Sequence, residues 1–587
     1  NNSSRCRKDS SSIMKRISAH QLRSHRWFGV NDMRSFLHRQ RVQQMGFERE
    51  EFIGKPIIGI INTWSELSTC HIHLRDRASV IKRAVFQAGG FAAELPALSV
   101  SEPLVKPTTM LYRNALALET EELIRSHPID GVVLMGGCDK STPGLIMGAL
   151  SADIPAIFFP AGSMINGDFR GQKIGAGTHT RKFWDDKKAG LLSENDWIEL
   201  ETEMTRSIGT CNTMGTASTM TSIVDAIGLT ITGGSSILAV QSAHSRLAHK
   251  SGNRIVEMVW EDLKISKIFT RQAIQNGIIT NMALGGSTNS IIHLIAMAGR
   301  NKIKLDLIDF DKVSKKIPVL ANILPSGEYL MEDFNKAGGL KALLSILKDK
   351  LDLSCITVSG KTIGEEIKDA HVSDNNVIRL LNNPISKKGT LTALFGNLAP
   401  NGAVIKPSAA SPKLLNHTGP AVVFKNVSDM YKRIHDPDLE VTEDSILVLQ
   451  NSGPQGGPGM PEWGNLPIPE KLLKKGVRDM VRISDARMSG THFGTCVLHV
   501  SPESFIGGNL ALVQNGDLIT LDVISGKLNL NVEKEELENR KKNWIQPEKK
   551  YKRGYVYLYT EHVTQAHEGC DFDFLESGSS TPEPEIF

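Results

Sequence analysis

The sequence lacks any hydrophobic run of about 18 residues, the length that a membrane-spanning helix needs, so we expect no membrane partner. It also has little cysteine, with 7 scattered residues in a chain of 587. Such an odd, sparse set argues against a disulfide framework and for a reducing compartment, and we predict a cytoplasmic location. The 68 basic and 64 acidic residues nearly balance, at a net charge of +4. This balance gives no reason to expect nucleic acid as a partner.

Charge is uneven only at the start of the chain, where the first 41 residues hold ten Lys or Arg and two Asp. Basic, serine-containing starts are typical of mitochondrial transit peptides, which makes import an alternative to the cytoplasm. A disordered basic segment is the other interpretation, and we predict disorder for residues 1–24. We predict the same for the tail 576–587, which is rich in Ser, Pro and Glu.

A chain of this length exceeds what one hydrophobic core usually supports, so we expect at least two domains. Short apolar runs alternate with amphipathic helical stretches in the first part, a pattern typical of a parallel sheet covered by helices. We predict an α/β domain over residues 25–382. The expected strands are 55–63, 131–135 and 156–160, and the expected helices include 75–88 and 113–126.

The pattern changes after residue 389 to short strands and frequent turns. We predict a mainly β, barrel-like domain over residues 390–575, with strands at 421–424, 445–449 and 497–500. Asn515-Gly516 and Ser525-Gly526 stand between alternating apolar positions, which indicates hairpin turns.

Reactive side chains follow the expected strand 131–135, where Cys138, Asp139 and Lys140 stand in succession. A thiol, a carboxylate and an amine are rarely buried together without a partner or a metal, so we take this stretch as the centre of an active site. Ligands of parallel α/β sheets bind beyond the carboxyl ends of the strands, and Cys70 follows another such end. Cys211 lies before an expected helix, whose N-terminus would lower the pKa of its thiol.

Cys70, Cys138 and Cys211 each follow a polar or glycine-rich loop, although no C-x-x-C motif joins them. A free cysteine is more often a small buried hydrophobic residue. Thiolates nevertheless select zinc or iron–sulfur clusters, and three ligands leave one metal position open, as a catalytic Lewis acid requires. A catalytic metal and a non-catalytic site, such as a redox sensor, both remain possible at this point.

Carboxylates stand in turn-like sequence at Glu102, Asp139 and Glu462, and carboxylate oxygens suit Mg²⁺. The alternative for any one of them is a solvated loop residue. Lys140 is followed by Ser, but a phosphate-binding loop would need Gly where Asp139 stands.

Ser489 and Thr491 lie in the string DARMSGT, which is no G-x-S-x-G elbow and so weakens a hydrolase interpretation. A serine acts as a base if a nearby cation stabilises its alkoxide, since its unperturbed pKa is far above neutral. A structural turn serine is the alternative.

Seven strings along the chain carry a wider resemblance. They are NTWSELSTCHIHL (62–74), SEP (101–103), GGCDKSTPG (136–144), GTCNTMGTASTM (209–220), GGSTN (285–289), GPGMPE (457–462) and DARMSGTHFGT (485–495). On these strings the chain resembles the dihydroxyacid and sugar-acid dehydratase family, which includes dihydroxyacid dehydratase and phosphogluconate dehydratase. The first two strings and the tail 561–575 are most similar to pentonate dehydratases, such as L-arabinonate and D-xylonate dehydratase.

The resemblance implies a [2Fe-2S] cluster, or alternatively a [4Fe-4S] cluster, and a Mg²⁺ ion. It assigns the cluster to Cys70, Cys138 and Cys211, and Mg²⁺ to Glu102, Asp139, Glu462 and a carbamylated Lys140. It makes Ser489 the base, with Thr491 beside it. His179 and His567 stand near positions that would touch the substrate. A homodimer or homotetramer is also implied.

We therefore expect a hydro-lyase that dehydrates a 2,3-dihydroxy sugar acid, a pentonate by resemblance, to a 2-oxo-3-deoxy acid. The first alternative is the dihydroxyacid dehydratase of branched-chain amino-acid biosynthesis, with the same chemistry on a smaller, apolar substrate. The second is a non-catalytic iron–sulfur redox sensor, against which Glu102, Asp139 and Glu462 argue.

Overall fold

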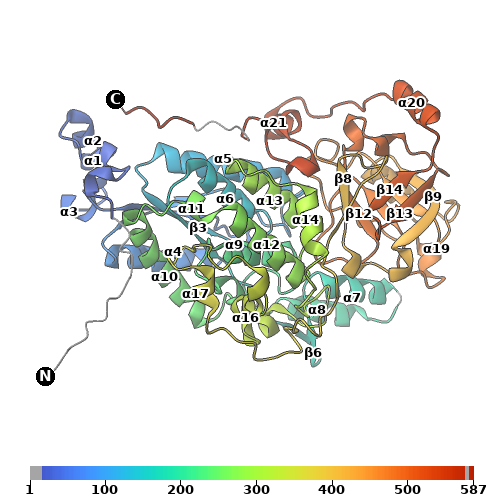
Figure 1. The fold of residues 1–587 in the computed structure, drawn as a ribbon, viewed down its shortest axis with the longest axis horizontal. Helices are drawn as coiled ribbons and strands as arrows, with labels where there is room; N and C mark the ends of the chain where they lie inside the picture. Colours follow the sequence, from blue (N-terminus) through green and yellow to red (C-terminus); the bar gives the residue numbers. More distant parts are fainter. Residues whose placement is uncertain (1–15, 189, 576–580, 587) are drawn as a thin grey trace.

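The protein consists of a helix-rich α/β region and a β-rich region that lie side by side along the long axis of the molecule (Figure 1). The computed structural model describes residues 16–188, 190–575 and 581–586. The α/β region precedes the β-rich region in the chain, so the predicted fold class is confirmed. The predicted domain limits, 25–382 and 390–575, stay predictions.

A four-stranded parallel sheet lies at the centre of the α/β region, in the order β2-β1-β3-β4. Its strands are β1 (Ile57–Asn62), β2 (Phe91–Pro96), β3 (Gly131–Gly136) and β4 (Ala156–Pro160). The predicted strands correspond to β1, β3 and β4, which are buried at every position, as expected when helices cover both faces of a sheet. The sequence analysis missed β2, which is only partly buried.

Helices connect the consecutive strands and pack on the sheet. The first three are α4 (Leu74–Gln87), α5 (Met110–Ser126) and α6 (Ser141–Ala152), of which α4 and α5 confirm two predicted helices. The other long helices are α9 (Thr216–Ile227), α10 (Ser242–Trp260), α12 (Arg271–Leu284) and α13 (Asn289–Arg300). The remaining elements are α1 (His25–Phe28), α2 (Met33–Gln43), α3 (Arg49–Phe52), β5 (Gly167–Phe169), β6 (Gln172–Ile174), α7 (Thr178–Lys188), α8 (Glu194–Met204), α11 (Ile265–Ile268), α14 (Leu307–Ser314), α15 (Met331–Lys336), α16 (Gly339–Ile346) and α17 (Ile363–Ile367).

An eight-stranded mixed sheet forms the β-rich region, in the order β14-β13-β9-β10-β11-β12-β8-β7. The strands are β7 (Thr392–Leu394), β8 (Gly402–Ile405), β9 (Asn416–Phe424), β10 (Ile446–Leu449), β11 (Arg482–Ser484), β12 (Cys496–Ser501), β13 (Leu518–Asp522) and β14 (Lys527–Leu530). Phe395, directly after β7, bridges to Lys527 of β14, so the two edges of the sheet meet. A nearly closed sheet leaves little free edge, and the predicted barrel-like form is confirmed.

One of the two predicted hairpin turns is wrong. Ser525 and Gly526 lie between β13 and β14, which pair antiparallel as predicted. Asn515 and Gly516 instead separate the 3₁₀-helix η8 (Asn509–Leu512) from β13. The Asn515 side chain accepts a hydrogen bond from Val423 N at 2.7 Å, so the turn is fixed to β9 rather than to a preceding strand.

The described chain ends pack on the α/β region. Ser24 N donates to Asp130 Oδ1 at 2.8 Å, and Glu583 forms ion pairs with Arg23 at 3.0 Å and Arg26 at 2.9 Å. Residues 16–24 and 581–586 thus have defined contacts, while the rest of the two segments predicted to be disordered lies outside the described residues.

Four helices belong to the last part of the chain. They are α18 (Val427–Arg433), α19 (Glu470–Leu473), α20 (Lys534–Asn543) and α21 (Gly554–His562). α21 returns to the α/β region, where the Tyr555 hydroxyl donates to Leu111 O at 2.8 Å. Arg113 of α5 donates to the carbonyls of Gly569 and Cys570, at 2.9 and 2.8 Å. The final part of the chain therefore belongs to the packing of the first region.

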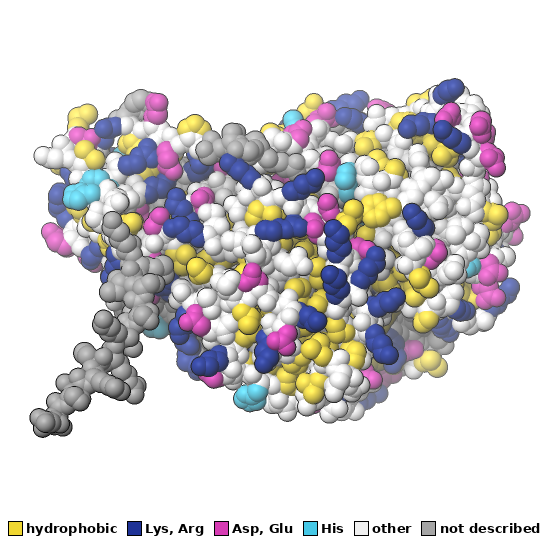
Figure 2. All heavy atoms as spheres, viewed as in Figure 1, with side chains coloured by type: hydrophobic (Ala, Val, Ile, Leu, Met, Phe, Trp, Pro, Cys, Tyr) yellow, Lys and Arg dark blue, Asp and Glu magenta, His cyan; other side chains and the backbone are white. Residues whose placement is uncertain are grey.

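Basic and acidic side chains are mixed over the face that Figure 2 shows, in keeping with the balanced net charge. Within the part of the chain that the structure describes, no helix combines the length and the apolar character that crossing a membrane would require.

Candidate active site

Two cysteines lie at the carboxyl ends of neighbouring strands. Cys70 follows β1 in the 3₁₀-helix η2 (Thr69–His71), and Cys138 follows β3. Both are buried, and their thiols are in hydrogen-bond contact. Cys211 lies before α9, close enough to interact electrostatically with both. The structure thus brings the three predicted cysteines together from three separate loops.

The prediction that the pKa of Cys211 is lowered is wrong. Burial raises the pKa of Cys211 to about 12, and the nearby Asp139 and Cys138 add to the rise. The contact with Cys138, followed by burial, also raises the pKa of Cys70 well above its ordinary value. The start of α9 does not offset this rise, although its Ser218 hydroxyl donates to Cys211 O at 3.4 Å. Ligation by a metal ion is one way to hold such thiols as thiolates at neutral pH.

His71 joins the two cysteine loops and was not identified from the sequence. Its Nε2 accepts a hydrogen bond from Cys138 N at 3.0 Å, so its Nδ1 carries the proton and faces Thr63 O at 3.0 Å. Burial lowers the pKa of His71 to about 4, which keeps the ring neutral. A neutral ring is needed here because one nitrogen must accept and the other donate.

Gly137 allows the Cys138 loop to pass close to the end of β4. A Cβ atom at this position would lie 2.6 Å from the Cβ and 2.9 Å from the backbone nitrogen of Ala161. Any larger residue would push the loop away from the sheet, and Cys138 and Asp139 with it.

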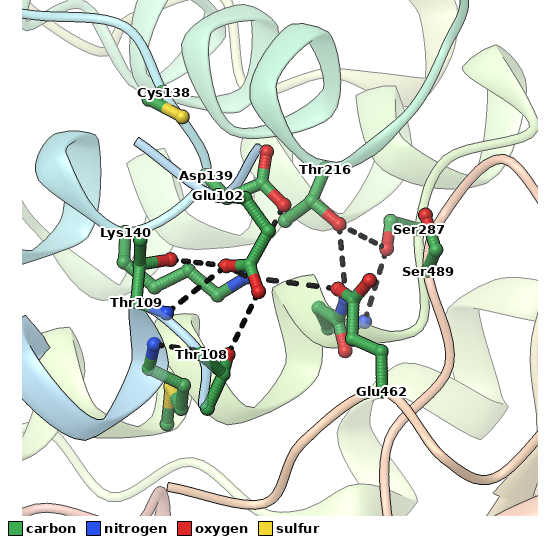
Figure 3. Close-up of polar contacts among 12 residues, drawn as sticks. Glu102, Thr108, Thr109, Cys138, Asp139, Lys140, Thr216, Ser287, Glu462 and Ser489 are labelled. Atoms are coloured by element: carbon green, nitrogen blue, oxygen red, sulfur yellow. Dashed lines mark hydrogen bonds and ion pairs between the residues drawn. The ribbon is translucent and has the colours of Figure 1, made fainter. Parts of the chain in front are cut away.

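Three carboxylates converge on the buried amine of Lys140. Its Nζ lies 3.0 Å from Glu102 Oε2, 3.1 Å from Asp139 Oδ2 and 3.7 Å from Glu462 Oε1. In Figure 3 these carboxylates turn toward the amine, with Cys138 to one side of the cluster and Ser489 to the other. Lys140 is wholly inaccessible to solvent, so its charge depends on these partners.

The electrostatics of the cluster favour a cation at its centre. Burial alone would raise the pKa of Glu102, but Lys140 and Arg487 outweigh it and lower the pKa to about 2. Burial opposes the charge of Lys140, yet Asp139 and Glu102 raise the pKa of its amine. For Glu462, burial exceeds the attraction of Lys140 and raises the pKa of its carboxyl.

Among the residues that the structure describes, no three His, Cys, Asp or Glu side chains already stand as a metal site. The donor chemistry nevertheless fits both implied groups. The oxygens of Glu102, Asp139 and Glu462 surround one cation, which is the donor set of a hard metal ion such as Mg²⁺. The three neighbouring thiols, two of them on buried cysteines, are a donor set for an iron–sulfur cluster with one open iron.

Ser489 and Thr491 come from the β-rich region and form one hydroxyl pair, with 3.1 Å between Ser489 Oγ and Thr491 Oγ1. The loop between them passes tightly over the start of α9. A Cβ at Gly490 would lie 2.8 Å from Thr216 N and 2.9 Å from Ser287 Cβ. The position of Ser489 therefore depends on a glycine that touches the other region.

The glycine-rich loop 284–289 supports the Ser489 loop. Asn289 Nδ2 donates to Met488 O at 3.1 Å and to Thr216 Oγ1 at 2.9 Å. Lys406, after β8, donates its Nζ to Gly285 O at 2.8 Å, and burial lowers the pKa of this lysine to about 7. Side chains of both regions thus fix this junction.

Comparison with known proteins decides the family. Residues 55–366 match the dihydroxy-acid/6-phosphogluconate dehydratase N-terminal domain, and residues 376–570 match the C-terminal domain. The chain belongs to the dihydroxy-acid/6-phosphogluconate dehydratase family. The family resemblance seen in the sequence is therefore confirmed.

The sequence of this dehydratase is more similar to sugar-acid dehydratases than to dihydroxy-acid dehydratases. It is 56% identical to 6-deoxy-6-sulfo-D-gluconate dehydratase of Pseudomonas putida, over 96% of this chain and 98% of the relative. It is 48% identical to L-arabinonate dehydratase of Rhizobium leguminosarum bv. trifolii, over 95% and 96% of the two chains. Identity to dihydroxy-acid dehydratase of Caldanaerobacter subterraneus subsp. tengcongensis is 36%, over 91% and 97%.

Arg487 was missed in the sequence although it lies two residues before Ser489. The guanidinium of Arg487 is fully buried in the dehydratase. It lies 3.4 Å from Glu462 Oε1 and 3.0 Å from Thr108 Oγ1. Thr108 also donates to Glu102 Oε1 at 2.9 Å. Arg487 therefore connects a carboxylate of each region, and only its place beside the predicted base could have drawn attention to it.

The loop that carries Glu462 is held by a second buried carboxylate. Glu503 accepts hydrogen bonds from the backbone of Gln455 and Gly456, both at 2.9 Å, and from Gln565 Nε2 at 3.0 Å. Burial, with the charge of Asp485 second, raises the pKa of Glu503 to about 7. This contact was not identified because the partners are distant in the chain.

The two histidines singled out in the sequence take different places. His179 lies on α7, where its Nδ1 accepts from Gly175 N at 2.8 Å; the preceding Thr178 donates to Thr491 O at 3.1 Å. His567 lies in the tail of the dehydratase, with Nδ1 2.8 Å from the Ser501 hydroxyl at the end of β12. The structure thus brings His179 near the Ser489 loop and gives His567 a contact on the barrel.

Proposed function

We propose that the protein is a hydro-lyase that removes water from a 2,3-dihydroxy sugar acid and gives a 2-oxo-3-deoxy acid. Membership of the dehydratase family supports the reaction type. The main support from the geometry is the meeting of three carboxylates, one buried amine and three thiols at the carboxyl edge of the sheet, with a serine beside them. A structural role would leave so many buried ionisable groups unexplained.

We assign Cys70, Cys138 and Cys211 to an iron–sulfur cluster of the [2Fe-2S] type, with [4Fe-4S] as the alternative. Glu102, Asp139, Glu462 and a carbamylated Lys140 would hold Mg²⁺. When bound, the two groups would supply Lewis-acid chemistry that acidifies the proton at C2 and assists loss of the hydroxyl at C3. CO₂ adds only to a neutral amine, so carbamylation of Lys140 requires the loss of its proton.

Ser489 is the base in this proposal. Its Oγ, as alkoxide, takes the proton from C2 and becomes a hydroxyl again. The electrons of the C2–H bond form the C2–C3 double bond as the C3–O bond breaks. The departing hydroxide takes the proton from Ser489 Oγ and leaves as water, which restores the alkoxide. The resulting enol then becomes the 2-oxo acid. Thr491, 3.1 Å from Ser489 Oγ, is placed to donate a hydrogen bond to the alkoxide.

A five-carbon aldonate is our first candidate substrate, because L-arabinonate dehydratase is among the similar proteins. Identity to 6-deoxy-6-sulfo-D-gluconate dehydratase is higher, at 56%, so that six-carbon sulfonated acid is an equally strong candidate. A branched-chain dihydroxy acid is less well supported, since the dihydroxy-acid dehydratase shows only 36% identity.

Turnover of separate acids by anaerobically purified, Mg²⁺-supplied protein tests the substrate. The panel comprises L-arabinonate, D-xylonate, 6-deoxy-6-sulfo-D-gluconate and 2,3-dihydroxyisovalerate, and the 2-oxo acid product is measured. Turnover of a sugar acid is expected. Turnover of the branched acid alone would overturn the substrate class and leave the reaction type intact, whereas no turnover of any acid by iron-loaded protein would contradict the proposal.

A Cys138→Ser variant tests the cofactor assignment separately. Iron content and turnover are expected to fall together, while Cys355→Ser, at a buried cysteine outside the site, should keep both. Full iron content in the Cys138 variant would refute the assignment. By resemblance we also propose a homodimer or homotetramer, which light scattering coupled to gel filtration would measure.

A further inference from the structure

A cavity of about 310 Å³ lies on the α/β region away from the candidate active site. It is formed between α10, the 3₁₀-helix η3 (Gly234–Ser236) and the start of α16. α10 and α16 both lie along the lower side of the α/β region in Figure 1. The volume falls within the range of small-molecule sites, about 300–1,000 Å³.

Three basic side chains line this cavity, Arg246, Lys250 and Lys341, and no acidic side chain is among the residues that line it. Arg246 and Lys250 belong to one face of α10, because they are four residues apart. Within the described parts of the chain, Lys250 has no hydrogen-bond or ion-pair partner. Arg246 donates to the neutral Ser242 hydroxyl, at 3.1 Å. Two of the three cations are therefore not neutralised by a carboxylate.

Two carboxylates that do not line the cavity, Glu366 and Asp225, act on Lys341. Lys341 lies 3.3 Å from Glu366, whose other oxygen accepts from the Ser359 hydroxyl at 2.7 Å. Asp225 lies beneath the cavity and accepts hydrogen bonds from Gly233 N at 3.0 Å and from Ser235 N at 3.0 Å. Asp225 thereby shapes the turn, and it does not line the cavity.

Neutral groups complete the lining. The hydroxyl of Thr232 is buried and has no hydrogen-bond partner, and Thr232 itself is 6% exposed and lines the cavity. Gly338 and Gly339, at the start of α16, also line it, so the positive end of that helix adds to the field of the three cations. A larger residue at Gly233 would be strained, because φ there is +88°, and its Cβ would lie 3.1 Å from Lys341 Cγ.

We propose that this cavity binds a small phosphorylated metabolite through its phosphate group. Arg246 and Lys250 neutralise the phosphate, and Lys341, which keeps its ion pair with Glu366, adds a hydrogen-bond donor. The unpaired Thr232 hydroxyl turns toward the cavity and donates to one of the phosphate oxygens. The two cations without a carboxylate partner, Arg246 and Lys250, match the charge of a dianion, whereas a monocarboxylate would leave one positive charge uncompensated.

The cavity is joined to the cysteine site by one short helix. Asn335, another lining residue, donates from Nδ2 to Ser236 O at 2.9 Å. Met331, at the start of the same helix α15, donates from its backbone nitrogen to Asn212 O at 2.9 Å, next to Cys211. A ligand that orders η3 and α15 would thus act on a loop that carries one of the candidate cluster ligands.

Titration of the full-length, cofactor-loaded protein with inorganic phosphate and with glycerol 3-phosphate tests the site. Calorimetry and the melting temperature are recorded at constant ionic strength, with chloride as the control for screening. Saturable binding is expected for at least one of the two, and binding to glycerol 3-phosphate but not to phosphate would show that the organic part is recognised. A double variant, Arg246→Gln with Lys250→Gln, should weaken this binding at least about tenfold.

A matched double variant, Lys432→Gln with Lys475→Gln, removes two exposed charges from the β-rich region and should bind like the wild type. Hydrogen exchange should slow at residues 231–236 and 338–341 only where binding occurs. Equal binding by both double variants, or no saturable binding by the wild type, would overturn the proposal. A changed oligomeric state of the Arg246/Lys250 variant without phosphate binding would also overturn it, because the cations would then serve a subunit contact.

Discussion

The two regions of the molecule bring different chemistry to the candidate site. The α/β region contributes the three cysteines, Glu102, Asp139 and Lys140, all on loops near strand ends or helix starts. The β-rich region contributes Glu462, Arg487 and Ser489. The first region thus holds most of the candidate metal ligands, and the second supplies the candidate base. Neither region has a complete site, so their relative position is itself part of the chemistry.

The largest effect should come from removing the hydroxyl that the β-rich region contributes. Ser489→Ala is expected to lower kcat by about 1,000-fold, a loss typical of a missing general base. Iron and magnesium content should not change, because the candidate ligands lie on other side chains. Steady-state kinetics with metal analysis measures both. Ser525→Ala, in an exposed turn of the barrel, is the control; near-normal kcat for the Ser489 variant would eliminate it as the base.

Moving the same loop without altering its reactive group should have the next largest effect. In Gly490→Ala the added methyl group would meet Thr216 N at 2.8 Å and push Ser489 away from the α/β region. A displacement of about 1 Å is enough to lower kcat about 100-fold. Gly299→Ala, where a Cβ meets nothing within 4 Å, is the matched control. Unchanged kinetics in both variants would show that the junction tolerates movement.

The pH dependence of stability tests the support of the Glu462 loop. The pKa of Glu503 is raised by burial and by Asp485 from 4.5 to about 7, so between these values the folded state keeps a proton that the unfolded chain has lost. The stabilisation is complete below about pH 4.5 and is lost as the pH rises through about 7. From pH 5.5 to 7.5, the wild type should lose about 2 kcal/mol of unfolding free energy relative to Glu503→Gln.

Urea unfolding at several pH values measures this difference. Glu536→Gln, at an exposed residue of α20, should follow the wild type over the whole range. Parallel pH profiles of the wild type and the Glu503 variant would mean that Glu503 is ionised in the folded protein.

The smallest effect is expected from the α/β side of the junction. Asn289→Ala removes the hydrogen bonds to Met488 O and Thr216 Oγ1, each worth about 1 kcal/mol. We expect a modest fall in melting temperature and about tenfold lower kcat. Asn539→Ala, on α20, provides the comparison. A loss of stability with full kcat would assign Asn289 to folding alone.

Much of the fold follows from local sequence. Continuous apolar runs predicted β1, β3 and β4, because strands covered on both faces need no alternation. β2 lacks such a run, since parts of it are exposed, and the segment around Asn515 alternates like a strand but is fixed by a contact with β9. Local pattern fails where a distant partner decides the conformation.

The candidate site shows the same limit. Cys70 and Cys138 could be placed together because the carboxyl ends of parallel strands meet at one edge. The supporting groups could not be found in this way. The contact between Arg487 and Thr108 joins positions 379 residues apart, and the contact between Glu503 and Gln565 becomes meaningful only when both lie behind the Glu462 loop. No spacing rule connects such pairs.

The return of the tail to α5 has a consequence for the order in which the protein is made. The buried guanidinium of Arg113 finds two of its acceptors in the carbonyls of Gly569 and Cys570. During translation, α5 leaves the ribosome more than 400 residues before these carbonyls exist. The guanidinium of Arg113 therefore lacks these two acceptors until synthesis is almost finished. A chain that stops short of residue 569 would contain every candidate site residue and still lack this closure.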